Sequence, residues 1–152
     1  MRVASPARRV AGYLRSLGTL MEAYRLASAA PAQAIAALRE RFPGLPDDYF
    51  EFLARHNGGE GALGVDPGWF QLWPAERVAE SSDGYGLPTF LPGYTAIGSN
   101  GGGELFVFAS VGVPPGLFMV PAIGMARETL APVAPSFTKF AAAFGKEWSE
   151  HA

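Results

Sequence analysis

Two glycine-rich runs, each ending in a glutamate, hold the residues of this chain whose types and spacing could do chemistry. The first run is Asn57-Gly58-Gly59-Glu60, and the second is Asn100-Gly101-Gly102-Gly103-Glu104. Glycine permits tight turns and close backbone approach, so we interpret the asparagine and glycine residues of the first run and the three glycines of the second as structural turns. Each glutamate is the first long side chain after its turn. We therefore expect Glu60 and Glu104 to approach one another at one end of a sheet.

The chemistry of this glutamate pair has three interpretations. Two carboxylates could form the acid and base of a glycoside hydrolase. They could instead accept hydrogen bonds from the N–H groups of the glycine loops and hold the two turns. A third role is an acidic docking point for an arginine or lysine of a partner protein.

Other catalytic and ligand-binding patterns are incomplete. Ser99 lies in Gly98-Ser99-Asn100-Gly101, which is not the sequence of a nucleophile elbow. No lysine follows the triple glycine as in a phosphate-binding loop, and Glu104 would repel an anion there. The chain has two histidines and no cysteine. We therefore predict neither a metal site nor a cofactor.

The composition favours one globular domain in the cytoplasm. The chain has 152 residues, of which 17% are charged, and no apolar run approaches the roughly 18 residues that a membrane-spanning helix needs. Residues 1–41 hold seven basic and two acidic side chains, whereas residues 42–152 hold five basic and twelve acidic ones. An acidic body repels nucleic acid and attracts basic partners. We expect no direct nucleic-acid or membrane partner.

Helical periodicity and turn signals place the glycine runs in an α+β fold. Apolar spacing predicts helices over 31–42 and 46–56, and a final helix that begins at Ser136 and extends to Trp148. Short apolar segments predict strands at 62–65, 69–73, 94–97, 105–108 and 117–120. Pro74 opens one helical turn, and 81–93 is predicted to be an irregular loop. We expect an antiparallel, twisted sheet of about four to six strands, with N-terminal helices and a C-terminal helix packed on it.

The first thirty residues differ in charge from the rest of the chain. We interpret residues 1–30 as a basic helical extension, with a short helix from Met21 to Ala30, and residues 31–152 as the α+β domain. An arginine-rich, acid-poor start also resembles an organellar transit peptide. A further alternative is that translation starts naturally at Met21.

Four blocks in order resemble the SUKH superfamily, over about residues 31–145. They are the helix start Leu45-Pro46-Asp47-Asp48-Tyr49 running into Asn57-Gly58-Gly59-Glu60-Gly61, Leu72-Trp73 with Glu76, Ala96–Glu104, and Ser136-Phe137 with Phe140. The resemblance implies an α+β fold and a non-catalytic binding function. Bacterial members of the superfamily are largely immunity proteins that bind and neutralise polymorphic toxins, often nucleases, and fungal members are regulatory scaffolds.

This resemblance leads us to expect a basic toxin domain, such as a nuclease, as the partner. The side chains that we predict to contact it are acidic, aromatic or polar: Glu60, Trp69, Trp73, Glu76, Asp83, Ser99, Asn100 and Glu104. Strand alternation places Trp69 and Trp73 on the face opposite Phe70 and Leu72. The alternatives are a regulatory scaffold without a toxin partner, and an enzyme that uses Glu60 and Glu104.

Overall fold

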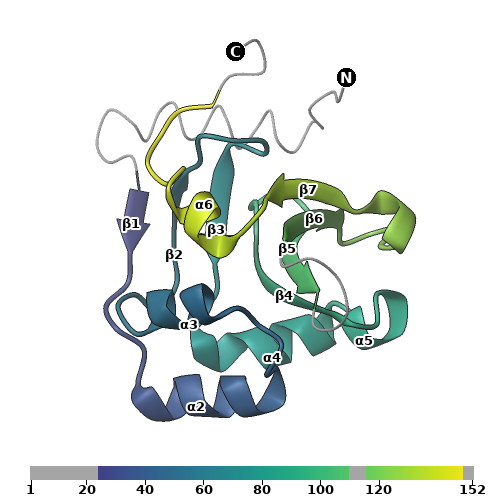
Figure 1. Cartoon of the computed structure of the whole chain (residues 1–152). Coiled ribbons are helices and arrows are strands. Elements are labelled where there is room, and N and C mark those ends of the chain that lie inside the picture. The colour runs from purple at the N-terminus through teal and green to yellow at the C-terminus, as the bar shows by residue number, and fades with distance from the viewer. Residues whose placement is uncertain (1–23, 110–115, 149–152) are drawn as a thin grey trace.

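The computed structural model describes residues 24–109 and 116–148, which form an antiparallel sheet with helices on both faces. Each strand pairs with its neighbour in sequence, in the order β1 to β7 (Figure 1). The seven strands are β1 Tyr24–Leu26, β2 Gly59–Ala62, β3 Trp69–Leu72, β4 Tyr94–Ser99, β5 Glu104–Ala109, β6 Leu117–Pro121 and β7 Ala131–Ala134.

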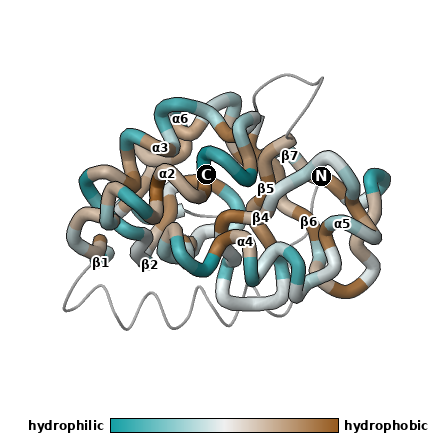
Figure 2. The backbone as a smooth tube through the Cα atoms, turned by 90° about the horizontal axis from the view of Figure 1, so that it is seen from below, coloured by the Kyte–Doolittle hydropathy of each residue, from teal (hydrophilic) through white to brown (hydrophobic). Residues whose placement is uncertain are grey.

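Helices lie on both sides of this sheet. They are α2 Ala32–Arg41, α3 Asp47–Leu53, α4 Ala75–Gly84, α5 Leu87–Phe90 and α6 Phe137–Ala141, with a 3₁₀ turn, η1, at Arg127–Thr129. Helices α3 and α6 lie on one side of the sheet, and α4 and α5 on the other (Figure 2). None of the described helices has the length and apolar character needed to cross a membrane.

The larger core lies between the sheet and the α3–α6 layer. Strand β5 contributes Phe106 and Phe108 to this core, and α6 contributes Phe137 and Phe140. The rings of Phe106 and Phe140 lie 5.1 Å apart between centroids, and Phe140 is fully buried. Such aromatic pairs gain stability from buried area and from ring geometry. This apolar contact is what fixes α6 against the middle of the sheet.

The smaller core lies on the opposite face and covers only part of it. Its buried residues come from α5, strands β4 to β6 and the chain before η1: Leu87, Leu91, Ala96, Leu105, Val107, Val120 and Met125. On the same face of β1, β2 and β3, the side chains of Arg25, Glu60 and Gln71 are exposed. We call this face of β1–β3 the open half-sheet.

A shared cap joins the two helices of the larger core. The Ser136 hydroxyl accepts a hydrogen bond from the Lys139 N–H, as the predicted N-cap requires. The Asp48 carboxylate of α3 accepts two more hydrogen bonds, from the Thr138 N–H at 2.9 Å and the Thr138 hydroxyl at 2.8 Å. The start of α6 is thus held by its own serine and by an acid from α3.

The α+β class and the packed helices are confirmed, but the sheet has seven strands rather than about four to six. Strands β1 and β7 were not predicted. The helix predicted from Met21 to Ala30 is wrong over Tyr24–Leu26, which pair with Gly59–Gly61. Three residues are too few for alternation to reveal a strand, so a tertiary contact decides the structure here. Residues 1–23 lie outside the described residues.

Two further predictions are corrected. The predicted irregular loop at 81–93 contains the end of α4 and all of α5. Glycines and prolines there suggested a loop, but the buried Ser82 hydroxyl bonds the backbone O and N of Ala96 and fixes α4 on β4. The predicted helix to Trp148 ends at Ala141. Beyond it, Gly145 N–H donates to the Ala62 carbonyl, so the chain bonds the end of β2 instead.

The two cores predict which aromatic residues matter for stability. Replacing Phe140, which is fully buried, by alanine should lower the free energy of unfolding by about 3–5 kcal/mol, because a cavity opens in the larger core. Phe90 is 61% exposed, and Phe90→Ala should change it by less than about 1 kcal/mol. Urea unfolding of the two variants measures the difference. Equal losses would contradict this assignment of the core.

Candidate functional site

Asn57 connects α4 with the chain after β1 at one end of the open half-sheet, through its side chain and its backbone N–H. Its Oδ1 accepts the Ala75 N–H at 2.7 Å, at the first residue of α4. Its Nδ2 donates to Oε1 of Glu76 at 2.9 Å. Its backbone N–H donates to the carbonyl of Ser28, which follows β1, also at 2.7 Å. Asn57 therefore caps α4 and joins it to the chain that leaves α3.

The neighbouring Gly58 allows the backbones to approach closely at this point. Its φ is +91°, and a Cβ atom there would lie 2.5 Å from the carbonyl oxygen of Leu72. A side chain would therefore meet the backbone of β3. The Gly58 carbonyl accepts the Ala27 N–H at 3.0 Å, which brings the end of β1 to the same place. Gly58 lies at the bend before β2, but Gly59, which was predicted to belong to the turn, is the first residue of β2, and the strand predicted at 62–65 begins at Gly59 instead.

Glu76 is exposed but is held in place by its bond to Asn57. The hydrogen bond from the Asn57 amide, helped by one from the backbone N–H of Glu76 itself, lowers the pKa of this carboxyl below its ordinary value. Both donors favour the ionised form, so Glu76 keeps a negative charge beside the start of α4. A charge of this sign also suits the positive end of the helix.

The second glycine run is closed by hydrogen bonds within the turn. Asn100 Oδ1 accepts the N–H groups of Gly102 and Glu104, at 2.9 and 3.1 Å. Asn100 Nδ2 donates to Glu104 Oε1 at 3.1 Å. Asn100 is fully buried and Glu104 is 9% exposed, so neither side chain can reach a partner without rearrangement. This geometry supports the structural interpretation of Glu104.

Strand register separates the two glutamates. Glu60 is opposite Gln71, Gln71 is opposite Ser99, and Ser99 is opposite Leu105. Residues opposite one another point to the same face, and neighbours in a strand point to opposite faces. Glu104 precedes Leu105 and therefore lies on the other face from Glu60. The predicted shared site of Glu60 and Glu104 is wrong, and with it the paired-carboxylate enzyme that would need both.

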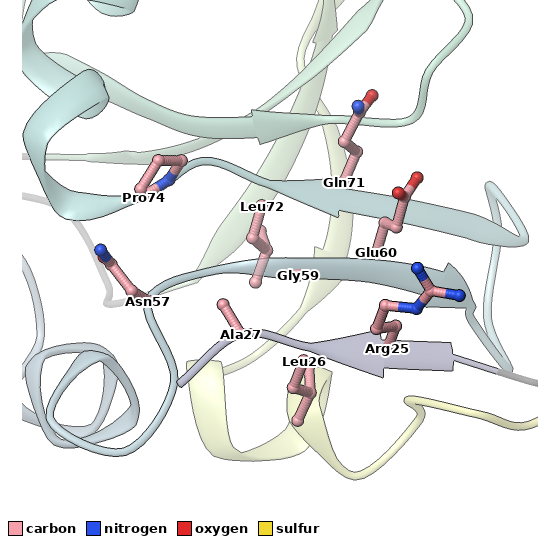
Figure 3. A pocket seen from close by; sticks show the side chains of 9 residues that line it. All are labelled: Arg25, Leu26, Ala27, Asn57, Gly59, Glu60, Gln71, Leu72 and Pro74. Atoms are coloured by element: carbon pink, nitrogen blue, oxygen red, sulfur yellow. The ribbon is translucent and has the colours of Figure 1, made fainter. Parts of the chain in front are cut away.

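The open half-sheet contains a shallow hollow of about 290 Å³ with polar side chains among an apolar lining. It is lined by Arg25, Leu26, Ala27, Asn57, Gly59, Glu60, Gln71, Leu72 and Pro74. Figure 3 shows the side chains of Arg25, Glu60 and Gln71 rising from three neighbouring strands on the same side. A carboxylate, an amide and a guanidinium group in one row can bind charged and hydrogen-bonding groups of another protein. The Ser99 hydroxyl extends the row, 3.4 Å from Gln71 Oε1.

The remaining predicted contact residues do not form one patch. Trp69 is half-buried on the face of Gln71, next to Gly101. Trp73 packs against both cores and stacks on Tyr85, with centroids 5.9 Å apart. Asp83 forms an ion pair with Arg41, its two oxygens 3.0 and 3.1 Å from Nη2, which joins α4 to α2.

Sequence reasoning missed Arg25 and Gln71. Gln71 is the one polar residue in Trp69-Phe70-Gln71-Leu72, and alternation alone places it opposite the buried Phe70 and Leu72. That signal was available in the sequence. Strand alternation could not place Arg25 in the same way, because the segment from Met21 to Ala30 was predicted to be a helix.

The described residues offer little for catalysis or metal binding. They contain no group of three or more histidine, cysteine or acidic side chains that could hold a metal ion. His56 Nδ1 lies 2.9 Å from the Ala27 carbonyl, and the Ser99 hydroxyl accepts the Gly101 N–H. Burial raises the pKa of Tyr49, whose hydroxyl lies in the larger core. His56 and Ser99 therefore make local contacts with the backbone, and the Tyr49 hydroxyl is buried without a hydrogen-bond partner among the described residues.

The Asn57–Glu76 bond predicts a pH-dependent contribution to stability. Because the folded protein lowers the pKa of Glu76, its stabilising effect is present above the ordinary pKa of about 4.5 and is lost as pH falls through the lower folded value. Glu76→Gln should therefore be less stable than wild type at pH 7, and the difference should vanish at low pH. Unfolding at both pH values measures this effect. Glu80→Gln, on the same helix, is the control. If Glu80→Gln shows the same pH-dependent loss of stability as Glu76→Gln, the role assigned to the Asn57–Glu76 bond is contradicted.

The second turn predicts a larger loss of stability that does not depend on a partner. Asn100→Ala removes the acceptor of two N–H groups and one hydrogen bond to Glu104 Oε1, all in a buried or half-buried place. The free energy of unfolding should fall by about 1–3 kcal/mol. Ser99→Ala removes hydrogen bonds of a half-exposed side chain and should lower the free energy of unfolding by less than about 1 kcal/mol. Thermal or urea unfolding of both variants tests the difference, and a near-neutral Asn100→Ala would refute the structural role.

Comparison with known proteins supports the resemblance found in the sequence. The family model described as the SMI1/KNR4 family, or SUKH-1, matches residues 29–143. This range begins in the segment between β1 and α2 and ends two residues after α6. No curated protein sequence matches the chain. Because the family model covers most of the chain, this protein is a member of the SMI1/KNR4 (SUKH-1) family.

Proposed function

We propose that this protein is a non-catalytic binding protein of the immunity type, which binds a cognate toxin domain through the open half-sheet and neutralises it. The observation that carries the proposal is the exposed row of Glu60 and Gln71 on a rigid sheet, beside the half-buried Trp69. Membership in the SUKH-1 family supports a binding role, which the resemblance associates with immunity to toxins.

The charge of the surface favours a basic partner. Glu60 is exposed opposite Arg25, and Glu76 is exposed at the end of the row beside Asn57, so two acids and one base lie along this surface. A nuclease active site is basic because it holds phosphates, so an acidic surface can approach it quickly and block it. Asp83 and Glu104 do not belong to the proposed contact surface, because one is paired with Arg41 and the other is buried in its turn.

A matched pair of charge reversals tests this surface. Glu60→Arg places a cation in the proposed contact and should weaken toxin binding by about tenfold or more, with little change in melting temperature because the side chain is exposed. Glu128→Arg, an exposed acid in η1 before the opposite edge strand, should bind as wild type does. The measurement is co-purification and affinity with the product of the adjacent gene, together with rescue of growth in cells that express it.

The outcomes separate the proposal from its alternatives. Binding without rescue of growth would favour the regulatory scaffold. If the product of the adjacent gene does not bind, the immunity function is contradicted. If Glu60→Arg binds as tightly as wild type, the assignment of the contact to the open half-sheet is contradicted.

A further inference from the structure

A second hollow lies on the other side of Pro74 from the open half-sheet. It has a volume of about 280 Å³ and is lined by Trp73, Pro74, Arg77, Ser81 and Tyr85. Arg77 and Ser81 of α4 and Tyr85, its C-cap residue, occur at intervals of four, which brings them to one face of the helix. One wall of this hollow is therefore a helix face, and the other is the Trp73-Pro74 segment that follows β3. We call it the α4 groove.

Two aromatic rings give the α4 groove a rigid apolar wall. The rings of Trp73 and Tyr85 are stacked at an interplanar angle of 4°. Trp73 is held because it packs against both cores, whereas Tyr85 is 46% exposed. A fixed aromatic side chain loses little conformational entropy when a ligand packs on it. Aromatic-lined grooves of this kind are suited to extended segments that contain proline.

The charge of the α4 groove differs from that of the open half-sheet. Arg77 is the one charged residue among its lining residues, and it is exposed. Of the three acids of α4, Glu76 bonds Asn57, Asp83 pairs with Arg41, and Glu80 is exposed three residues after Arg77. Within the described part of the chain, no ion pair is recorded for Arg77. Its guanidinium is therefore suited to a carboxylate of a ligand.

We propose that the α4 groove binds an extended protein segment in which a proline lies next to an aspartate or glutamate. The proline packs on the Trp73 and Tyr85 rings, and the carboxylate pairs with Arg77. The ligand of this groove carries an acid, whereas the partner proposed to bind at Glu60 is basic. The site rests on the aromatic stack and on Arg77, and it stands whether or not the partner at Glu60 is a toxin.

Titration calorimetry of the full chain with two short synthetic peptides tests the proposal. In one peptide prolines alternate with aspartates, and in the other they alternate with lysines. Wild type should bind the aspartate peptide at least about tenfold more tightly than the lysine peptide. Arg77→Glu should reverse this preference, and Tyr85→Ala should weaken binding of both peptides by about tenfold.

Two variants outside the groove are controls. Phe90→Ala removes a different exposed aromatic ring, and Arg55→Glu reverses a different exposed arginine. Both should bind the aspartate peptide as wild type does. Melting temperatures show that each variant is folded. Failure of the aspartate peptide to bind, a preference unchanged in Arg77→Glu, or equal weakening by Tyr85→Ala and Phe90→Ala would each overturn the proposal.

Discussion

Close backbone approach at Asn57-Gly58 is the constraint on which the arrangement of this protein depends. At this turn the end of α3, the chain after β1, the end of β3 and the start of α4 all come together. A residue with a side chain cannot replace Gly58 without moving β3, and no apolar residue can replace Asn57 without uncapping α4. Because α4 lies on one face of the sheet and α3 on the other, this single turn fixes the spacing of both layers.

The acidic residues of the chain are used unequally by this fold. Asp48 caps α6, Glu76 bonds Asn57, Asp83 joins two helices and Glu104 closes a turn. A count of charges in the sequence treats all of these groups alike, although several serve the folded structure. The proposed contact surface is a small polar row on the open half-sheet, and not the whole acidic part of the chain. That proposal depends on contact geometry more than on net charge.

Patterns longer than one helical turn could be read from the sequence, and contacts between distant segments could not. Helices α2 and α3, the β4–β5 hairpin and the Ser136 cap follow from apolar spacing and turn residues. Strand β1 depends on its pairing with β2, and the second half of α4 depends on the Ser82–Ala96 bonds. The candidate site shows the same limit. The sequence singled out Glu60 as a candidate, but its face relative to Glu104 depends on register across four strands.

The order of the strands has a consequence for how the chain folds. Each strand pairs with the next, and four of the six pairings, from β2–β3 and from β4–β5 to β6–β7, close short loops with a low entropic cost, whereas β1–β2 and β3–β4 enclose helices. The contacts of α6 and the following residues are different, because Asp48 meets Thr138 and Leu63 forms a bridge with Phe144 across a long stretch of sequence. The chain after β7 thus joins α3 and the end of β2 to the C-terminal part of the domain. Cooperativity between the early and late parts of the chain is concentrated in those contacts.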